Sequence, residues 1–239
     1  MVGDAHLGSA DIRDEEAFHE LLDAVPSLGT RLIVMGDLFD FWFEYRAVIP
    51  RRPFRTLTRL SLLVERGVEV RVFGGNHDRW GGSFWAEDLK IPFHPEGADL
   101  ELAGRRAHVA HGDGLAEQQL GGKLIHRITR SRITVGVFRR LHPDLGFKLA
   151  DRLSGGLAEG NKTDAAMDAA ADAQERWARA LLAARAEIEL VLLAHTHRQR
   201  LIEVEPGRFY VNAGQWMTER CYAVIAPGEI STLRWPARP

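Results

Sequence analysis

Polar residues able to bind a metal ion directly follow an apolar run in this sequence. The segment Gly75-Asn76-His77-Asp78 comes straight after the run VEVRVF (68–73), and it places an amide, an imidazole and a carboxylate side by side. Such groups cost free energy when they are buried without partners. A loop that hydrogen-bonds only to itself would satisfy them, and so would a bound ion.

Other polar residues follow apolar runs in the same way. They are Asp4, His6, Asp37, Asp40, His111, His195 and His197. In open α/β sheets the carboxyl ends of the strands face one crevice, so residues far apart in the sequence are expected to meet there. The alternate spacing in Asp4-x-His6 and His195-x-His197 places both side chains of each pair on one face of an extended segment. The sequence therefore predicts one shared site.

The residue types indicate which metal this site would bind. The seven predicted ligands are Asp4, His6, Asp37, Asn76, His111, His195 and His197. Carboxylates, imidazoles and one amide without a thiolate suit Mn²⁺, Fe²⁺, Zn²⁺ or Co²⁺, and argue against a structural cysteine-type zinc site. Seven ligands are too many for one ion and suit two if Asp37 bridges them. Two such ions can activate water and clamp a phosphoryl oxygen.

Each motif also has an ordinary structural explanation when it is taken alone. Asp4-x-His6 could form a turn or a cap, and the loop around Asn76 could be closed by an Asx turn. The pair His195-x-His197 could lie at an exposed strand end. Because all the motifs occur in order behind apolar runs, their combination favours a metal site.

Alternating strands and helices in the first half of the chain would position these residues. The pattern predicts helices over 15–25 and 55–67, followed by strands over 31–35 and 68–73 respectively. Strand–helix–strand alternation favours βαβ units and a parallel sheet.

The second half of the chain has a different pattern. Turns at Gly104, at Pro206-Gly207 and at Pro227-Gly228 predict hairpins, so antiparallel strands should dominate there. An Ala-rich helix is expected over 163–188, followed by a buried strand over 190–194.

The segment 115–156 fits neither pattern and is predicted to be an inserted helical cap within a single domain spanning 1–239. It contains eight Lys or Arg against three Asp or Glu, so 8 − 3 gives +5 on a chain whose net charge is −2. The segment is therefore both apolar and basic. The alternative is an amphipathic hairpin with a solvated basic side.

The composition narrows the class of protein. The net charge of −2 gives no reason to expect a nucleic-acid partner. The single cysteine, Cys221, excludes an intramolecular disulfide and suits a reducing compartment. No apolar run reaches the ~18 residues of a membrane span. The expected location is cytoplasmic.

Five motifs together resemble the calcineurin-like metallophosphoesterase superfamily. They are Asp4-x-His6, Gly36-Asp37-x-x-Asp40, Gly75-Asn76-His77-Asp78, His111 in HGD, and Ala194-His195-x-His197. The match covers the whole chain except the cap. It implies an α/β (α+β) fold, a four-layer α-β-β-α sandwich, and two divalent ions, with Mn²⁺ favoured.

The resemblance also implies how the ligands divide between the two ions. The first ion would be bound by Asp4, His6, Asp37 and His197, and the second by Asp37, Asn76, His111 and His195. Two positions depart from the usual pattern: His77 stands where the best-known branch has Arg, and Ala194 stands where Gly is usual.

Within the superfamily the chain is similar to bacterial UDP-2,3-diacylglucosamine diphosphatases of lipid A synthesis. The segments that carry this similarity are GDLFDFW (36–42), HGDGL (111–115), NKTDAAMD (161–168) and NAGQWMTE (212–219). The resemblance implies hydrolysis of a lipid-linked nucleotide to UMP and a diacylglucosamine 1-phosphate. For such a substrate the apolar faces of the cap could line an acyl chamber, and its basic side chains could meet phosphates or an anionic membrane surface. Peripheral contact with the inner face of the inner membrane is then a further expectation.

Roles for further residues follow from the same resemblance. His77 is expected to protonate a leaving oxygen or stabilise its charge, and Asp78 to orient the His77 ring, unless Asp78 only closes its loop. Asp40 is expected to orient a ligand. The residues expected to contact substrate are Arg79, Lys123, Arg127, Arg130, Asn161 and Lys162.

The amino end raises a separate expectation. Only Met1 and Val2 precede Gly3-Asp4, whereas a buried strand usually has about five residues. We therefore expect the native chain to start upstream of Met1.

Two other functions stay open on the sequence. A phosphodiesterase or phosphatase acting on a soluble nucleotide would share every predicted ligand, although it would not need an apolar cap. A non-catalytic scaffold would be expected to lose ligands, whereas all seven are present here.

Overall fold

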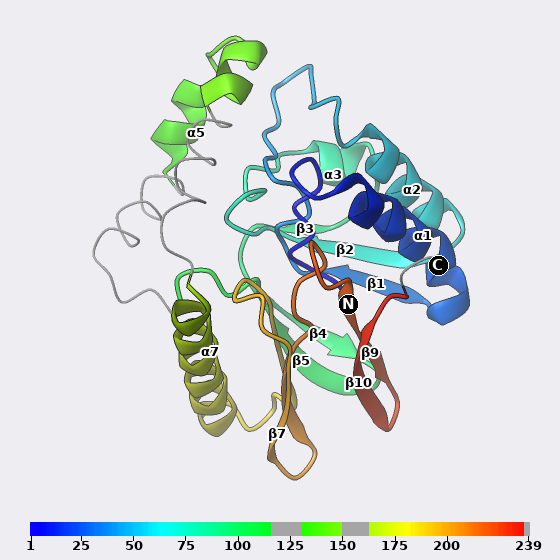
Figure 1. Cartoon of the computed structure of the whole chain (residues 1–239), viewed down its shortest axis with the longest axis vertical. Helices are drawn as coiled ribbons and strands as arrows, with labels where there is room; N and C mark the ends of the chain where they lie inside the picture. The colour runs from blue at the N-terminus through cyan, green and yellow to red at the C-terminus, as the bar shows by residue number, and fades with distance from the viewer. Residues whose placement is uncertain (116–130, 150–162, 237–239) are drawn as a thin grey trace.

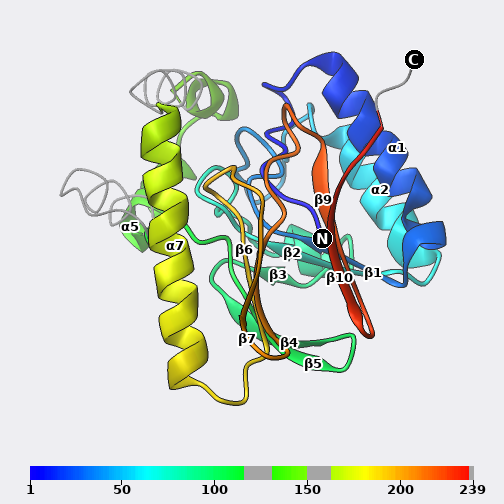
Figure 2. The ribbon, with the colours of Figure 1, turned by 60° about the horizontal axis from the view of Figure 1, so that its bottom comes forward.

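The computed structural model describes residues 1–115, 131–149 and 163–236. In this part of the chain the strands form a three-stranded sheet, a five-stranded sheet and a two-stranded hairpin. Helices lie on opposite sides of the strands, as Figure 1 and Figure 2 show.

The first sheet is parallel. It consists of β1 (Arg31–Val34), β2 (Glu69–Phe73) and β3 (Phe93–His94), in that order. The helices α1 (Ile12–Leu28) and α2 (Phe54–Glu65) are the crossover elements of this half. Both were predicted, and their apolar faces pack with the residues of β1 and β2 in one buried cluster.

Local sequence explains where α1 begins. The Asp11 side chain accepts a hydrogen bond from Arg13 N at 2.8 Å, and Asp14 and Glu15 lie in the first turn. Such a cap satisfies one of the free backbone N–H groups of the helix, and acidic residues there favour the helix dipole. The helix therefore starts three residues before the apolar pattern alone would place it.

The chain start joins the hairpin to the first sheet. Val2 forms a parallel bridge to Val34 at the edge of β1. Met1 exchanges two hydrogen bonds with Ala223, which lies in β9 (Cys221–Ala226). β9 pairs antiparallel with β10 (Glu229–Arg234). The segment before Asp4 thus stands between β1 and β9.

The second sheet has five strands in the order β4-β5-β6-β8-β7. These strands are β4 (Ala98–Leu102), β5 (Arg105–Val109), β6 (Leu190–Leu193), β8 (Arg208–Asn212) and β7 (Arg200–Glu205). The central strand β6 is buried along its whole length, whereas burial alternates along the edge strand β7. A central strand is covered on both faces, which explains the apolar run at 190–193. An edge strand has one face toward solvent, which explains the alternating pattern at 200–205.

Helix α7 (Asp164–Ala184) covers the second sheet. It begins at Thr163, whose side chain accepts a hydrogen bond from Ala166 N, and it ends four residues before the predicted boundary at 188. Its buried residues Ala178 and Leu182 pack with Val191 and Tyr210 of the sheet.

Three buried clusters define the layers. One lies between α1, α2 and the first sheet, and another lies between the second sheet and α7. The third contains Ile33 and Met35 together with Val109, Leu192 and Val211, so it lies between the two sheets. This gives the order helix, sheet, sheet, helix. The predicted four-layer α-β-β-α fold is confirmed.

The described part of the cap contains helix α5 (Arg132–Phe138) and a helical segment at 143–149. Phe138 is buried among Phe43, Tyr45 and Trp80 of the main body. The rest of the predicted cap lies outside the described residues, so the boundaries 115–156 stay a prediction. Among the described helices none is both long and apolar enough to cross a membrane.

Candidate metal centre

The predicted ligands lie in loops at the carboxyl ends of neighbouring strands. Asp37 follows β1, the 75–78 loop follows β2, His111 follows β5, and His195 follows β6. The loops after β1 and β2 belong to one sheet and those after β5 and β6 to the other. The site therefore lies at one end of the sandwich and draws on both sheets.

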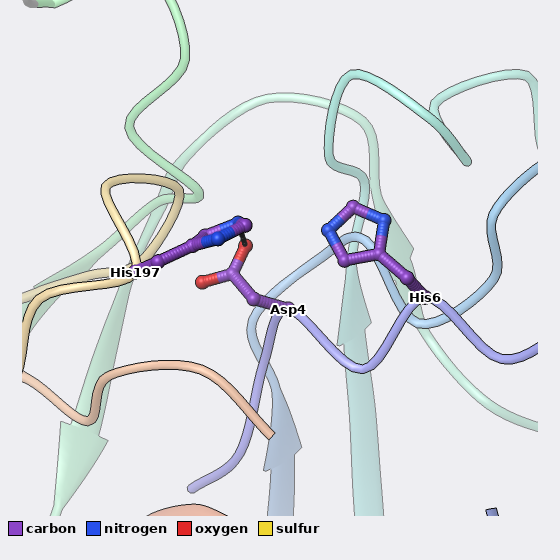
Figure 3. Close-up of side chains that lie close together, drawn as sticks. All are labelled: Asp4, His6 and His197. Atoms are coloured by element: carbon purple, nitrogen blue, oxygen red, sulfur yellow. Dashed lines mark ion pairs between the residues drawn. The ribbon is translucent and has the colours of Figure 1, made fainter. Parts of the chain in front are cut away.

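Three groups of side chains in the described chain have ligand atoms within 4.8 Å of one another. They are Asp4, His6 and His197; His6, Asp37 and His77; and Asp37, His111 and His195. Figure 3 shows the first group, in which His6 and His197 flank the Asp4 carboxylate. Six of the seven predicted ligands are thus brought together, and His77 joins them.

Asp37 lies where two of these groups meet. Its Oδ2 atom is 3.2 Å from His111 Nε2 and 3.9 Å from His6 Nε2. Its other oxygen, Oδ1, accepts a hydrogen bond from His77 N at 2.9 Å. Asp37 is 2% exposed, so its carboxylate is shielded from water. It faces one histidine on each side. A bridging position between two ions fits this geometry.

Asp4 connects the first group to the loop after β6. Its Oδ1 atom is 3.6 Å from His197 Nε2, the ion pair drawn in Figure 3, and its Oδ2 accepts a hydrogen bond from His195 N at 2.9 Å. One carboxylate therefore positions the backbone of the 195–197 loop and presents an oxygen to His197.

A backbone carbonyl fixes the orientation of the His111 ring. Its Nδ1 atom lies 2.8 Å from the Met35 carbonyl oxygen, to which it donates. Its Nε2 atom then faces Asp37 and lies 3.2 Å from His195 Nδ1. Histidine ligands characteristically donate one ring N–H to a carbonyl and offer the other nitrogen to the metal. This arrangement fits a metal ligand.

The charges of the site are strongly coupled. Burial alone would raise the pKa of Asp37, but the positive charge of His111 and its hydrogen bond lower that pKa well below its usual value. Burial alone would lower the pKa of His111, yet the negative charge of Asp37 raises it to about 10. The cluster therefore keeps a buried carboxylate ionised, the form that binds a cation.

The backbone at the site is unusual. Five predicted ligands have positive φ angles: Asp4 (50°), His6 (44°), Asp37 (50°), His195 (73°) and His197 (58°). Non-glycine residues rarely adopt this region, and when they do they tend to cluster at functional sites, where the surrounding structure maintains the strain. The sequence gives no sign of this strain, because Asp and His are not restricted to such conformations.

At two positions only glycine fits, because a side chain of the site lies too close for a Cβ atom. A Cβ on Gly75 would lie 2.0 Å from Asp37 Oδ1, and one on Gly36 would lie 2.6 Å from His111 Nδ1. Gly36 also has a φ of +92°. Glycine in both motifs therefore lets the loops after β1 and β2 pack directly against the charged side chains.

Asp78 is bonded to the backbone of its own loop and of the loop after β1. Its carboxylate accepts hydrogen bonds from the backbone N–H groups of Gly75 (2.8 Å), Asp37 (3.1 Å) and Leu38 (2.7 Å). These bonds connect the loops after β1 and β2 to each other, and they support the alternative in which Asp78 closes its loop. Burial and the negative charge of Asp37 raise the pKa of Asp78 to about 6.

Asp40 is the residue that holds the His77 ring. His77 Nδ1 lies 2.7 Å from the Asp40 carbonyl oxygen and 3.8 Å from its Oδ1 atom. Because Nδ1 donates to this carbonyl, the Nε2 side of the ring is left for the site. The ring also lies edge-on to His6, with 4.7 Å between centroids.

Arg79, which was expected to contact substrate, has partners inside the protein. Its side chain is 7% exposed and pairs with Asp113, and it donates to Glu96 (2.9 Å) and to the Pro95 carbonyl (3.0 Å). The guanidinium is therefore used inside the protein, where it ties the loop after β2 to the loop after β5.

Removing this guanidinium should destabilise the fold. Arg79→Ala would remove a buried guanidinium that pairs with Asp113 and donates to Glu96 and to the Pro95 carbonyl, a change that typically costs about 3–5 kcal/mol. Chemical denaturation should show this loss. The exposed pair between Arg59 and Asp23 provides a control, because Arg59→Ala should cost less than about 1 kcal/mol. Equal effects of the two substitutions would contradict the structural role of Arg79.

Several predicted residues cannot be placed in the cluster. Asn76 is exposed at the tip of its loop, next to His77. Lys123, Arg127, Arg130, Asn161 and Lys162 lie outside the described residues. Ala194, which departs from the usual glycine, is not among the residues with positive φ, so its side chain is accommodated by an ordinary backbone.

Gln174 was missed by the sequence analysis. This fully buried residue of α7 donates to the carbonyl oxygens of Gly112 (3.2 Å) and Ala194 (3.0 Å), which adjoin His111 and His195. A signal for it exists, because Gln174 falls on the buried stripe of α7 with Ala171 and Ala178. A polar residue on an apolar helix face indicates a polar partner in the core.

Comparisons with known proteins agree with the site. Over 94% of its length the chain is 29% identical to UDP-2,3-diacylglucosamine hydrolase of Porphyromonas gingivalis, covering 92% of that protein. The Actinobacillus succinogenes and Escherichia coli O7:K1 proteins of the same name are 24% and 22% identical, with coverage of 96% and 99% of this chain and 96% and 98% of theirs. No family model matches the chain.

Solved structures show a weaker likeness. A predicted phosphoesterase from Streptococcus pneumoniae aligns with a TM-score of 0.40 at 17% identity, covering 93% of this chain and 78% of its own. Zinc-bound Vps29 from Entamoeba histolytica aligns with a TM-score of 0.39 at 15% identity, covering 90% and 72%. At such low TM-scores the likeness supports no conclusion about the site.

The four layers and the convergent Asp and His cluster define the class: the chain has the architecture and ligand set of a metal-dependent phosphoesterase. Within that class, the curated proteins that it resembles over nearly their whole length are UDP-2,3-diacylglucosamine hydrolases. The predicted resemblance, the fold class and the expectation of a hydrolase are confirmed.

Proposed function

We propose that the protein hydrolyses the diphosphate bond of UDP-2,3-diacylglucosamine, giving UMP and 2,3-diacylglucosamine 1-phosphate. The observation that carries this proposal is the position of Asp37 between His6 and His111, in a chain similar over 94% of its length to a hydrolase of this substrate. Water adds to the phosphorus next to uridine, and the bond from that phosphorus to the bridging oxygen breaks.

The residues of the site fit two divalent ions. One would be bound by Asp4, His6, Asp37 and His197, and the other by Asp37, Asn76, His111 and His195. When bound, such ions supply an activated water and neutralise charge on the phosphoryl oxygens. Mixed carboxylate and imidazole ligands support Mn²⁺ as the first choice, with Fe²⁺, Zn²⁺ and Co²⁺ as alternatives.

His77 is the proposed proton donor to the leaving group. Its Nδ1–H is held by the Asp40 carbonyl at 2.7 Å, which fixes the plane of the ring. Its N–H group donates to Asp37 Oδ1 at 2.9 Å, which fixes the loop beside the shared carboxylate. A ring fixed at Nδ1, on a loop whose backbone N–H is itself anchored, can place a proton on the departing phosphate oxygen without reorganisation.

Replacement of His77 should separate chemistry from metal binding. For His77→Ala we expect kcat to fall by roughly 100- to 1,000-fold, because a positioned general acid is lost. Metal analysis of the purified variant should still give the metal content of the unmodified protein. Loss of one ion per chain would instead make His77 a metal ligand and contradict its assignment as proton donor.

Aromatic and apolar side chains of the cap support an acylated substrate. Phe41 and Trp80, which directly follow Asp40 and Arg79 in the sequence, lie against Phe138 of the cap at 5.9 and 5.2 Å between ring centroids. In the described part of the cap, Val137 and Leu145 are 57% and 59% exposed.

Charge next to this surface supports contact with a membrane. Arg139 and Arg140 follow α5 and are exposed. Apolar side chains flanked by cations favour the surface of an anionic membrane. We therefore propose peripheral contact on the cytoplasmic side of the inner membrane, where a lipid-linked substrate would be met.

A hydrolase of a soluble nucleotide is the second candidate, since it would use the same ligands. UMP release from UDP-2,3-diacylglucosamine with added Mn²⁺ decides between the two. We expect turnover of the lipid-linked substrate and little turnover of a soluble nucleotide diester. The opposite result would overturn the proposed substrate. A chain that is purified without chelator and contains no metal would indicate a non-catalytic scaffold.

A further inference from the structure

A buried polar residue of α7 contacts both loops that carry His111 and His195. This residue is Gln174, which lies on the buried stripe of α7, the helix that covers the second sheet (Figure 2). Its Nε2 atom is 3.2 Å from the carbonyl oxygen of Gly112, the residue after His111. The same atom is 3.0 Å from the carbonyl oxygen of Ala194, the residue before His195. One side chain therefore joins the two loops.

The two carbonyls determine which way the Gln174 amide points. A carbonyl oxygen can only accept a hydrogen bond, so the nitrogen of the amide, and not its oxygen, must face both carbonyls. The amide oxygen Oε1 then faces donors at longer distances, which are Tyr210 OH (3.3 Å), Thr196 Oγ1 (3.4 Å) and Asn212 Nδ2 (3.4 Å). The amide therefore has partners at both ends, and its plane is fixed.

The residues around the Gln174 amide are adapted to it. A Cβ on Gly112 would overlap the amide nitrogen, and Gly112 has a φ of +98°, which side chains rarely adopt. The glycine of the His-Gly-Asp motif is thus explained by a residue of α7, 62 positions along the chain. Asn212 reinforces the second contact, because its Nδ2 atom also donates to the Ala194 carbonyl at 3.1 Å.

The loops that Gln174 joins carry two ligand atoms of one metal group. This group consists of Asp37, His111 and His195. His111 Nε2 and His195 Nδ1 are 3.2 Å apart, so a small shift of either loop changes the distance between two ligand atoms. Groups behind the ligands orient them and thereby tune how tightly the ion is bound. The Gln174 amide is in the place where such an effect would be largest.

Helix packing alone does not explain a glutamine at this position. Burying an amide costs free energy that its hydrogen bonds only offset. An apolar side chain of the same length would pack against the sheet without this cost. The two carbonyls would keep other donors, because Ala194 O also accepts from Thr196 N (2.9 Å) and Gly112 O from Leu115 N (3.3 Å). The position of the loops is therefore the better explanation for Gln174.

We propose that Gln174 is a positioning residue of the metal centre. It holds the loops of His111 and His195 at the separation at which both can bind the same ion, and so it sets the affinity for that ion. The ion expected beside Asp4 and His6 should be affected less, because neither residue adjoins the carbonyls that Gln174 holds. This inference rests on the proposed metal centre and is independent of the proposed substrate.

Gln174→Met tests this role, because methionine has the same length and cannot donate to the carbonyls. Binding of Mn²⁺ to the metal-free protein is followed by calorimetric titration. We expect the affinity for one ion to fall by roughly 10- to 100-fold, the usual effect of losing a group behind a metal ligand, while the other ion keeps its affinity. Unchanged affinity for both ions would overturn the proposal.

Electron paramagnetic resonance gives a second measurement on the same variant. Two Mn²⁺ ions that share a carboxylate give a different spectrum from an isolated Mn²⁺ ion. At Mn²⁺ concentrations that fill both sites of the parent, the Gln174→Met protein should show the spectrum of the isolated ion. A spectrum identical to that of the parent would overturn the proposal.

Leu182→Ala is the matched control for stability. Leu182 is also 0% exposed on α7, about 12 Å along the helix from Gln174. Its truncation leaves a cavity and should lower Tm at least as much as Gln174→Met does, yet both ions should bind as in the parent. An equal loss of metal affinity in this control would overturn the proposal, since instability alone would then explain the effect.

Gln174→Asn provides the result if the methionine variant does not fold. Asparagine is one methylene shorter, so its amide can reach only one of the two carbonyls, and the affinity for one ion should fall by about tenfold. Binding of both ions as in the parent would overturn the proposal. A parent protein that binds no metal would instead overturn the proposed metal centre, and this inference with it.

Discussion

Asp37→Asn is expected to lower kcat for UMP release by ~1,000-fold or more, an increase of roughly 4 kcal/mol in the activation barrier. The substitution keeps the shape of the side chain and can keep the hydrogen bond from His77 N. It removes the negative charge that faces His111 Nε2 at 3.2 Å and His6 Nε2 at 3.9 Å. The amide of asparagine offers one neutral oxygen, which attracts two cations much more weakly than a carboxylate does.

Metal analysis should show the cause of this loss. We expect the Asp37→Asn variant to bind less than half the metal of the unmodified protein. Asp99→Asn is the matched control: Asp99 also faces a histidine, with 2.8 Å between its Oδ1 and His108 Nδ1, and it pairs with Arg185. Because Asp99 lies in β4, outside the cluster, the control should keep its activity. Full activity of the Asp37 variant would refute the site.

Gly75→Ala is expected to damage both the site and the fold. The added Cβ would lie 2.0 Å from Asp37 Oδ1 and 2.5 Å from Asp37 N, so the loop after β2 must move away from the loop after β1. This movement would stretch the hydrogen bonds that Asp78 accepts from both loops. Overpacking of this kind costs about 3 kcal/mol, which corresponds to a Tm lower by roughly 6–12 °C.

Gly136→Ala provides the control for this prediction. Gly136 lies in helix α5, has no positive φ, and a Cβ there would meet nothing within 4 Å. Because alanine is the better helix former, this variant should be as stable as the parent or slightly more stable. Thermal unfolding of the two variants side by side decides the matter. A Gly75→Ala protein with unchanged Tm and activity would mean that the two loops are not in close contact.

Much of the fold could be predicted because it depends on local patterns. The helical periods near Phe18 and Leu60 and the continuous apolar run at 190–193 each determine the type of an element and the side that it buries. Boundaries were less accurate. α1 begins at the Asp11 cap, and α7 ends at Ala184, where Arg185 N bonds to the Leu181 carbonyl.

The types of the ligands could be predicted for a similar reason. Asp4, Asp37 and His111 each follow an apolar run, and the carboxyl ends of strands are where such side chains gather, although here they come from both sheets. The roles of Asp78 and Arg79 could not be predicted, because each depends on a segment distant in the sequence. Asp78 is bonded to the backbone of Leu38, 40 positions away, and Arg79 to Asp113, 34 positions away.

By itself, the sequence determined the elements of the sandwich and the residues able to bind a pair of metal ions. Those properties depend on residue type and on spacing along the chain. Only the tertiary structure decided that Asp40, and not Asp78, holds the ring of His77, and that five of the predicted ligands have left-handed backbones. Such features depend on which atoms of distant segments come into contact, and packing alone sets these contacts.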